Sequence, residues 1–139
     1  MTADAPEMIL NRALAQFLHD HDLAVYDPGQ PLSERGIRLD GKMPTSVTEF
    51  TLLTPLRPIP DGRANMTYRT QFYTARKGSP ATIRAWAADL RAVLDQAEYT
   101  PNILGISYAT EFSGTDFDAD TQGRVSTALT YHFRGRRQR

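Results

Sequence analysis

Residues 66–94 have the sequence MTYRTQFYTARKGSPATIRAWAADLRAVL, in which the spacing of apolar side chains changes partway along. The first ten residues alternate between apolar and polar side chains, which predicts a strand over 66–75. Ser79 and Pro80 are typical of the N-cap and first position of a helix, and we expect this helix to end near Asp95. Its apolar side chains recur every three or four residues and form one stripe, made of Ile83, Trp86, Ala87, Leu90 and Leu94.

The same two periods predict one more helix and four more strands on either side of this stretch. The helix covers residues 6–20, and the strands cover 23–26, 48–54, 104–112 and 124–133. Two polar loops, at 27–45 and 113–123, and a proline-rich connection at 55–62 separate them. The order of elements predicts an α+β fold with a single mixed or antiparallel sheet of about five strands. Two helices should cover one face of this sheet, in a single domain over residues 1–134 that is followed by a basic tail over 135–139.

The apolar positions of these elements form the predicted core. We expect helical residues to contribute one apolar face and strand residues to contribute one face of the sheet. The candidate core residues are Leu14, Phe17, Phe50, Leu52, Phe72, Ile83, Trp86, Leu90, Leu94, Ile106 and Leu129.

The composition excludes several classes of protein and site. The 139 residues, 40% of them hydrophobic and 23% charged, are ordinary for a globular domain and argue against wholesale disorder. The absence of cysteine excludes disulfides, thiolate zinc sites, iron–sulfur clusters and cysteine nucleophiles. No apolar run exceeds four residues, whereas a membrane span needs about 20. The first residues also lack the apolar segment of a secretory signal, so we expect none.

The formal net charge is zero, yet the charges are unevenly distributed. Residues 1–61 hold nine acidic and five basic residues, whereas residues 121–139 hold five arginines and no acid. The candidates for charged partner contacts are Arg124, Arg134, Arg136, Arg137 and Arg139. Arginines grouped in this way can neutralise phosphates, but no recognised nucleic-acid module surrounds them, so any contact with DNA would be nonspecific. The alternative is a solvated, disordered tail.

Two acidic runs resemble metal-binding sequences. In the run of residues 19–22, HDHD, the two histidines would point in roughly opposite directions on a helix, which argues against a shared ion. The run DFDAD at 116–120 has the spacing of a calcium loop but has Thr121 in place of the glycine and Thr127 in place of the last acid. No nucleophile elbow, phosphate loop or dinucleotide fingerprint occurs, and His132 has no triad signature. We therefore expect no enzyme, no catalytic residue, no metal and no cofactor.

Three stretches resemble the tail terminator proteins of long-tailed bacteriophages, also described as minor capsid or minor tail proteins. They are VTEFTLLTP at 47–55, TQFYTARKGSP at 70–80 with the helix that follows it, and the hairpin containing DTQGR at 120–124 and YHF at 131–133. The likeness covers roughly residues 1–134. The loop at 27–45 departs from it, because many relatives have a shorter connection there.

The resemblance implies a structural protein with an α+β fold. Such a protein forms a hexameric ring that caps the tail tube, ends its polymerisation and joins the tail to the head connector. The implied partners are other copies of the chain, the tail tube protein and a connector or stopper protein, with nonspecific contact with genomic DNA in the lumen as a further candidate. The implied location is the head–tail junction of the virion, after assembly in the host cytoplasm. The alternatives are another head–tail connector, such as a stopper or completion protein, and a small α+β enzyme or ligand-binding domain.

Overall fold

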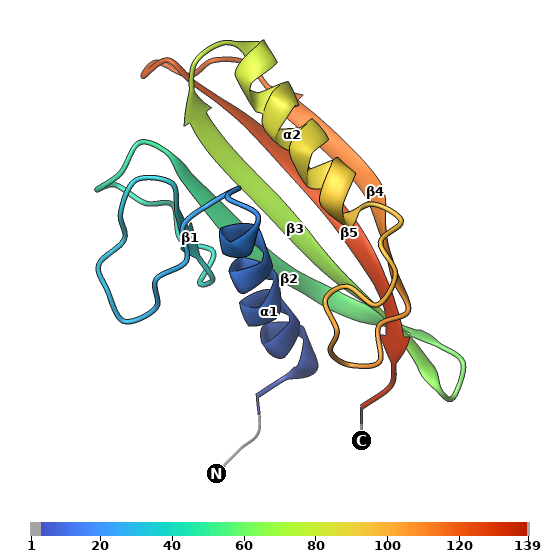
Figure 1. Ribbon diagram of the computed structural model, residues 1–139. Coiled ribbons are helices and arrows are strands. Elements are labelled where there is room, and N and C mark those ends of the chain that lie inside the picture. Colours follow the sequence, from blue (N-terminus) through green and yellow to red (C-terminus); the bar gives the residue numbers. More distant parts are fainter. Residues whose placement is uncertain (1–3, 139) are drawn as a thin grey trace.

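The computed structural model describes residues 4–138 and has one mixed sheet with two helices on one of its faces (Figure 1). The strand order is β1-β2-β3-β5-β4; β1 is parallel to β2, and the other neighbouring strands are antiparallel. The α+β fold predicted from the sequence is confirmed. The elements are α1 (Pro6–Asp20), β1 (Gly36–Arg38), β2 (Phe50–Asp61), β3 (Asn65–Lys77), α2 (Pro80–Leu94), β4 (Tyr108–Phe117) and β5 (Arg124–Arg136).

The turn between β3 and α2 depends on a glycine. Gly78 has a φ of +134°, which side chains rarely adopt, and a Cβ there would lie 2.4 Å from Thr82 Oγ1. That oxygen accepts a hydrogen bond from the Ser79 N–H at 3.3 Å and so satisfies one free donor at the start of α2. Pro80 occupies the first helical turn, where its missing N–H costs nothing.

The main core lies between the helices and the inner face of the sheet. The inner face carries the even-numbered residues of β3 and the odd-numbered residues of β5, including Phe72 and Tyr131, whose rings meet edge to face with centroids 5.5 Å apart. The predicted core residues found in this layer are Leu14, Phe72, Ile83, Trp86, Leu90, Leu94, Ile106 and Leu129, all of which are buried. Phe17 is half-buried at its margin.

Phe50 and Leu52 are buried on the opposite face of the sheet. They pair in register with Ala75 and Tyr73, the odd-numbered residues of β3, and form a separate small apolar cluster there. The prediction that they share one core with the helices was therefore wrong about the face. The inner positions of β2 are instead Thr51 and Leu53. The hydroxyl of Thr51 lies 3.0 Å from that of Thr74, and the carbonyl of Leu53 accepts a hydrogen bond from Asn11 of α1.

The first two predicted strands, at 23–26 and 48–54, differ from their predicted bounds. Residues 23–26 form only an isolated bridge, between Val25 and Gly36, and the loop predicted at 27–45 contains the short strand β1. β2 continues through the proline-rich stretch to Asp61. Beyond Leu52 this strand has no partner on its outer side among the described residues, so prolines there remove no ladder hydrogen bond.

The last hairpin is longer than the alternation predicts. β4 begins at Tyr108 and continues to Phe117, well into the loop predicted at 113–123, because β5 supplies a paired ladder for these polar residues. β5 continues to Arg136, so it includes residues that the sequence assigned to a tail starting at 135. Asn65 of β3 pairs with Arg136, and the Tyr68 hydroxyl donates to the Arg136 carbonyl at 2.7 Å.

Candidate interaction surfaces

The structure brings some of the predicted contact arginines together and separates others. Arg134, Arg136 and Arg137 lie at the C-terminal end of β5, beside the turn of the β2–β3 hairpin (Figure 1). Arg124 lies at the opposite end of the same strand, where its Nε donates to Asp120 at 2.8 Å and its Cζ lies 5.7 Å from the centroid of the Phe50 ring. Arg139 lies outside the described residues.

Three further arginines, which the sequence pattern did not single out, lie at this end of the sheet. Arg57 and Arg69 are on the two strands of the β2–β3 hairpin, and Arg63 is in its turn. Recognising the hairpin around Gly62 would have revealed them, but residues 55–62 were predicted as a connection rather than a strand. We call the surface formed by six residues the arginine end; they are Arg57, Arg63, Arg69, Arg134, Arg136 and Arg137.

Backbone groups hold several of these side chains in place. Arg69 donates through Nε and Nη2 to the Arg57 carbonyl at 3.0 and 2.7 Å. Arg137 donates its backbone N–H to the Ala64 carbonyl at 2.9 Å and its Nη2 to the Gly62 carbonyl at 2.8 Å. One ion pair occurs among the described residues of this surface, between Arg134 Nη2 and Asp61 Oδ2 at 3.3 Å. The arginine end is thus ordered by the hairpin and carries excess positive charge.

A second surface is the outer edge of β4. From residue 112 to 117, no strand among the described residues pairs with this edge, whereas residues 95–99 cover the edge nearer Tyr108. Two large aromatic side chains stand on the free part, with Phe112 65% and Phe117 47% exposed. An edge strand with free backbone groups and exposed aromatic residues is suited to contact with another chain.

Phe112 stacks on His132 of β5 on the sheet face opposite the helices. Their ring centroids are 4.1 Å apart and their planes differ by 11°. The Nε2 atom of His132 is buried and has no hydrogen-bond partner among the described residues. Burial, and secondarily the charge of Arg69, lower the pKa of His132, which favours the neutral imidazole. The neutral imidazole of His132 therefore supports an aromatic contact with Phe112.

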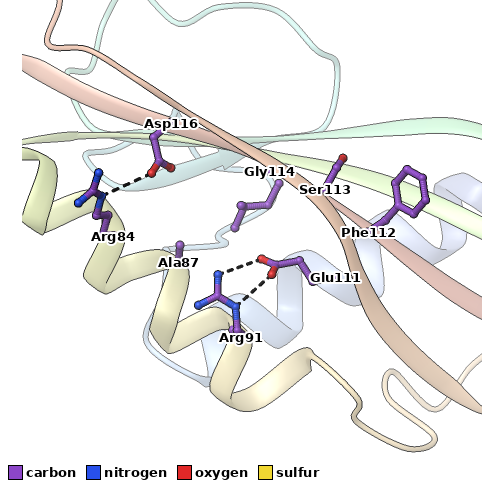
Figure 2. Close-up of a pocket in the computed structure, with 9 residues that line it drawn as sticks. Arg84, Ala87, Arg91, Glu111, Phe112, Ser113, Gly114 and Asp116 are labelled. Atoms are coloured by element: carbon purple, nitrogen blue, oxygen red, sulfur yellow. Dashed lines mark hydrogen bonds and ion pairs between the residues drawn. The ribbon is translucent and has the colours of Figure 1, made fainter.

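A groove of about 470 Å³ separates α2 from β4 (Figure 2). Two ion pairs cross it: Arg84 Nε lies 3.7 Å from Asp116 Oδ2, and Arg91 Nε donates to Glu111 Oε2 at 3.0 Å. A Cβ on Gly114 would lie 2.7 Å from Leu129 Cδ2, so the small residue lets β4 approach the floor of the groove.

The charged side chains of this groove connect α2 to β4 through ion pairs. Glu111 raises the pKa of Arg91, chiefly through their hydrogen bond, and so favours the charged guanidinium. The hydroxyl of the buried Tyr131, which has no hydrogen-bond partner among the described residues, does not line the groove. Burial, followed by the charges of Glu111 and Asp95, raises the pKa of Tyr131, which keeps the phenol protonated.

The two runs that resemble metal sites have structural contacts. His19 Nδ1 accepts a hydrogen bond from the Tyr26 N–H at 3.2 Å. Asp120 accepts hydrogen bonds from the backbone of Gln122 and Arg124, and these contacts lower its pKa. Residues 4–138 contain no group of three or more His, Asp or Glu side chains placed to hold a metal ion. In the same residues, neither helix is long and apolar enough to cross a membrane.

Comparison with known proteins adds no assignment to these surfaces. No protein-family model matches the chain, and no curated protein matches it.

Proposed function

We propose that the protein is a tail terminator, a structural subunit that forms a hexameric ring at the end of a phage tail tube. In this role it stops tube polymerisation and provides the surface to which the head connector attaches. The likeness of residues 47–55, 70–80 and 120–133 to this family motivates the proposal. The structural observation that supports it best is the free β4 edge with its exposed Phe112 and Phe117.

The geometry of the sheet suits a ring. A closed ring repeats one heterologous contact, in which two different surfaces of the subunit meet. The β4 edge and the side of the sheet that carries β1 and the loop 27–45 are two such surfaces, and they lie at opposite ends of the strand order. A contact between the β4 edge of one subunit and the loop side of the next can therefore repeat around an axis.

The arginine end lies where β2, β3 and β5 end, and Arg57 alone stands on the part of β2 that has no outer partner among the described residues. In the ring arrangement above, it would face an adjoining ring or the lumen instead of the neighbouring subunit. The charge asymmetry of the sequence is therefore assigned to contacts outside the ring.

The test is electron microscopy of tails assembled with and without the protein. We expect a six-membered ring at the end of tubes of uniform length in its presence, and overlong tubes in its absence. A dodecamer or a two-fold dimer at the tube end would contradict the proposal. Uncapped tubes of normal length, with heads unattached, would instead favour the alternative of a stopper or completion protein.

A further inference from the structure

We propose that the arginine end binds the phosphate backbone of double-stranded DNA without sequence preference. The two segments that form it, residues 57–69 and 134–137, carry six arginines and only one acidic residue, Asp61. Because the whole chain has a formal net charge of zero, this end concentrates positive charge that other surfaces balance. The inference concerns the isolated chain and does not require the ring.

The guanidinium groups retain donors for phosphate. Each guanidinium has five N–H donors in a planar fork. Three of the side chains are exposed and have no hydrogen bond or ion pair among the described residues, namely Arg57, Arg63 and Arg136. Arg69 and Arg137 donate to neutral carbonyls, which leaves their charge uncompensated and part of each fork free. Guanidinium is well suited to phosphate because two parallel N–H groups fit two phosphate oxygens.

The backbone presents these side chains from fixed positions. Asn65 pairs with Arg136 and Thr67 pairs with Arg134, while the Arg137 N–H closes onto Ala64. Three adjacent strands, spaced about 4.8 Å apart, therefore hold the Cα atoms of this surface. Folding has already ordered the backbone of this surface. Binding of DNA therefore costs less conformational entropy than it would with a flexible tail.

The composition of the surface favours duplex DNA over an acidic protein. A stable protein interface buries an apolar centre, but Ile59 is the only large apolar side chain exposed within the two segments. Duplex DNA carries one negative charge per about 1.7 Å of its axis and needs no apolar partner. Closely grouped arginines with a single acid among them match such a polyanion.

The experiment measures binding of the full chain to a short fluorescent duplex by anisotropy over a series of salt concentrations. We expect log K to fall linearly with log[salt], with a slope of about −4.5 to −5.4 if five or six phosphates are neutralised. A duplex of unrelated sequence should bind equally well, because phosphate contacts carry no sequence information.

The decisive comparison uses two triple variants that lose the same charge. Arg57→Gln, Arg63→Gln and Arg136→Gln together should flatten the slope by about 2 to 3 units and weaken binding at low salt at least tenfold. The matched control, Arg12→Gln, Arg38→Gln and Arg84→Gln, removes three ion-paired arginines of α1, β1 and α2, of which Arg38 is half-buried, and should keep most of the wild-type slope. Thermal unfolding of both variants would show that they remain folded.

Three results would overturn the inference. The first is no binding of duplex DNA by the wild-type chain at low salt. The second is equal slopes for the two triple variants, which would mean that the arginine end is not the binding surface. The third is stronger binding, at the same salt, to polyglutamate or to vesicles of anionic lipid, which would assign the surface to an acidic protein or to a membrane. None of these three results decides whether the protein forms a ring, which electron microscopy of the tails tests separately.

Discussion

Arg76 and Trp86 donate hydrogen bonds to the same acceptor, the backbone carbonyl oxygen of Leu23. Arg76 Nη2 lies 2.9 Å and Trp86 Nε1 lies 2.8 Å from this oxygen, and Arg76 Cζ is 5.9 Å from the centroid of the Trp86 ring. Arg76 Nη1 also donates to the carbonyls of Phe50 and Ala75. One side chain thus ties the segment after α1 to β2 and β3 beneath α2. Burial lowers the pKa of Arg76 to about 10, which leaves the guanidinium charged at neutral pH.

Replacing Arg76 with methionine should destabilise the fold by about 2–4 kcal/mol. Hydrogen bonds to charged groups are worth about 1.5–3 kcal/mol each, and a buried carbonyl left without a partner costs about 1–3 kcal/mol. Urea unfolding measures the difference. Arg63→Met, at an exposed position in the β2–β3 turn, is the control and should change the unfolding free energy by about 0.5 kcal/mol or less. An Arg76→Met protein as stable as this control would show that the carbonyls of Phe50 and Ala75 do not need Arg76 as a donor, since Trp86 still donates to the Leu23 carbonyl.

Trp86 should contribute chiefly through packing. It is 6% exposed in the main core, so Trp86→Ala should cost about 3–5 kcal/mol. Trp86→Phe keeps most of the apolar contact and removes only the indole donor, and Arg76 still serves the Leu23 carbonyl. Its cost should be about 0.5–1.5 kcal/mol. Unfolding followed by circular dichroism gives both values, and a red-shifted native emission of the wild-type indole would contradict the burial itself.

The prediction from sequence succeeded where one periodic pattern decides an element. The amphipathic stripe of α2 predicted both its length and the burial of Trp86, because a helix has one apolar face and can bury it in one way. The sequence pattern determined less well which face of the sheet each strand residue occupies. In β2, apolar residues occupy both faces, so alternation could not indicate whether Phe50 or Leu53 turns towards the helices. Pairing with β3 decides this, and pairing is a long-range property.

The candidate surfaces were less predictable than the fold. The arginine end combines residues that are far apart in sequence, Arg57 and Arg137 among them, through a hairpin that prolines disguised as a loop. Arg76 lies on the inner face of β3, the same face as Tyr68 and Phe72. A charged side chain is not normally predicted to be buried in a core, so the sequence did not indicate its position. Its burial depends on three carbonyls whose positions only the folded chain defines.

Stability should fall as the pH is lowered through the range in which His132 titrates. The pKa of His132 is lowered in the folded protein by burial and by Arg69, whereas an unfolded histidine titrates near 6.5. Below about pH 6.5 the unfolded chain therefore binds more protons than the folded one, and the unfolding free energy decreases until the pH passes the folded pKa. Above about pH 7 this contribution is complete and constant.

Urea unfolding at several pH values from 7.5 to about 5 tests this dependence. His132→Gln should have a flatter profile than the wild type, whatever its absolute stability. Acidic groups with lowered pKa values, such as Glu34 and Asp40, lose their contribution only as the pH falls from about 4.5, which separates the two ranges. A wild-type profile as flat as that of His132→Gln would contradict the lowered pKa.

The β4 edge should matter to assembly more than to folding. Phe112→Ser with Phe117→Ser removes two exposed rings, so the unfolding free energy should decrease by only about 1 kcal/mol. If these rings contact the next subunit, electron microscopy should find few capped tubes. Ile59→Ser, another exposed apolar position, is the control and should cap tubes normally. Normal capping by the double variant would exclude this edge as the ring contact.

Two variants of the last residues should distinguish what this segment contributes to the stability of the fold from what its charges contribute to assembly. A chain that ends at Phe133 loses the residues of β5 that pair with β3 from Asn65 to Thr67, and Tyr68 loses the Arg136 carbonyl as an acceptor. We expect this truncation to destabilise the fold, because Gly135 and Arg136, which the sequence assigned to a basic tail, belong to β5. Arg134→Gln with Arg137→Gln keeps the strand and removes two charges, and individual exposed pairs are worth only about 0–1 kcal/mol. Six copies in a ring would add through effective concentration, so this full-length variant should fold normally and join heads to tails poorly, as the wild type should at high salt. Particle yield measured against ionic strength checks this, and a full yield at physiological salt would show that these charges do not act in joining.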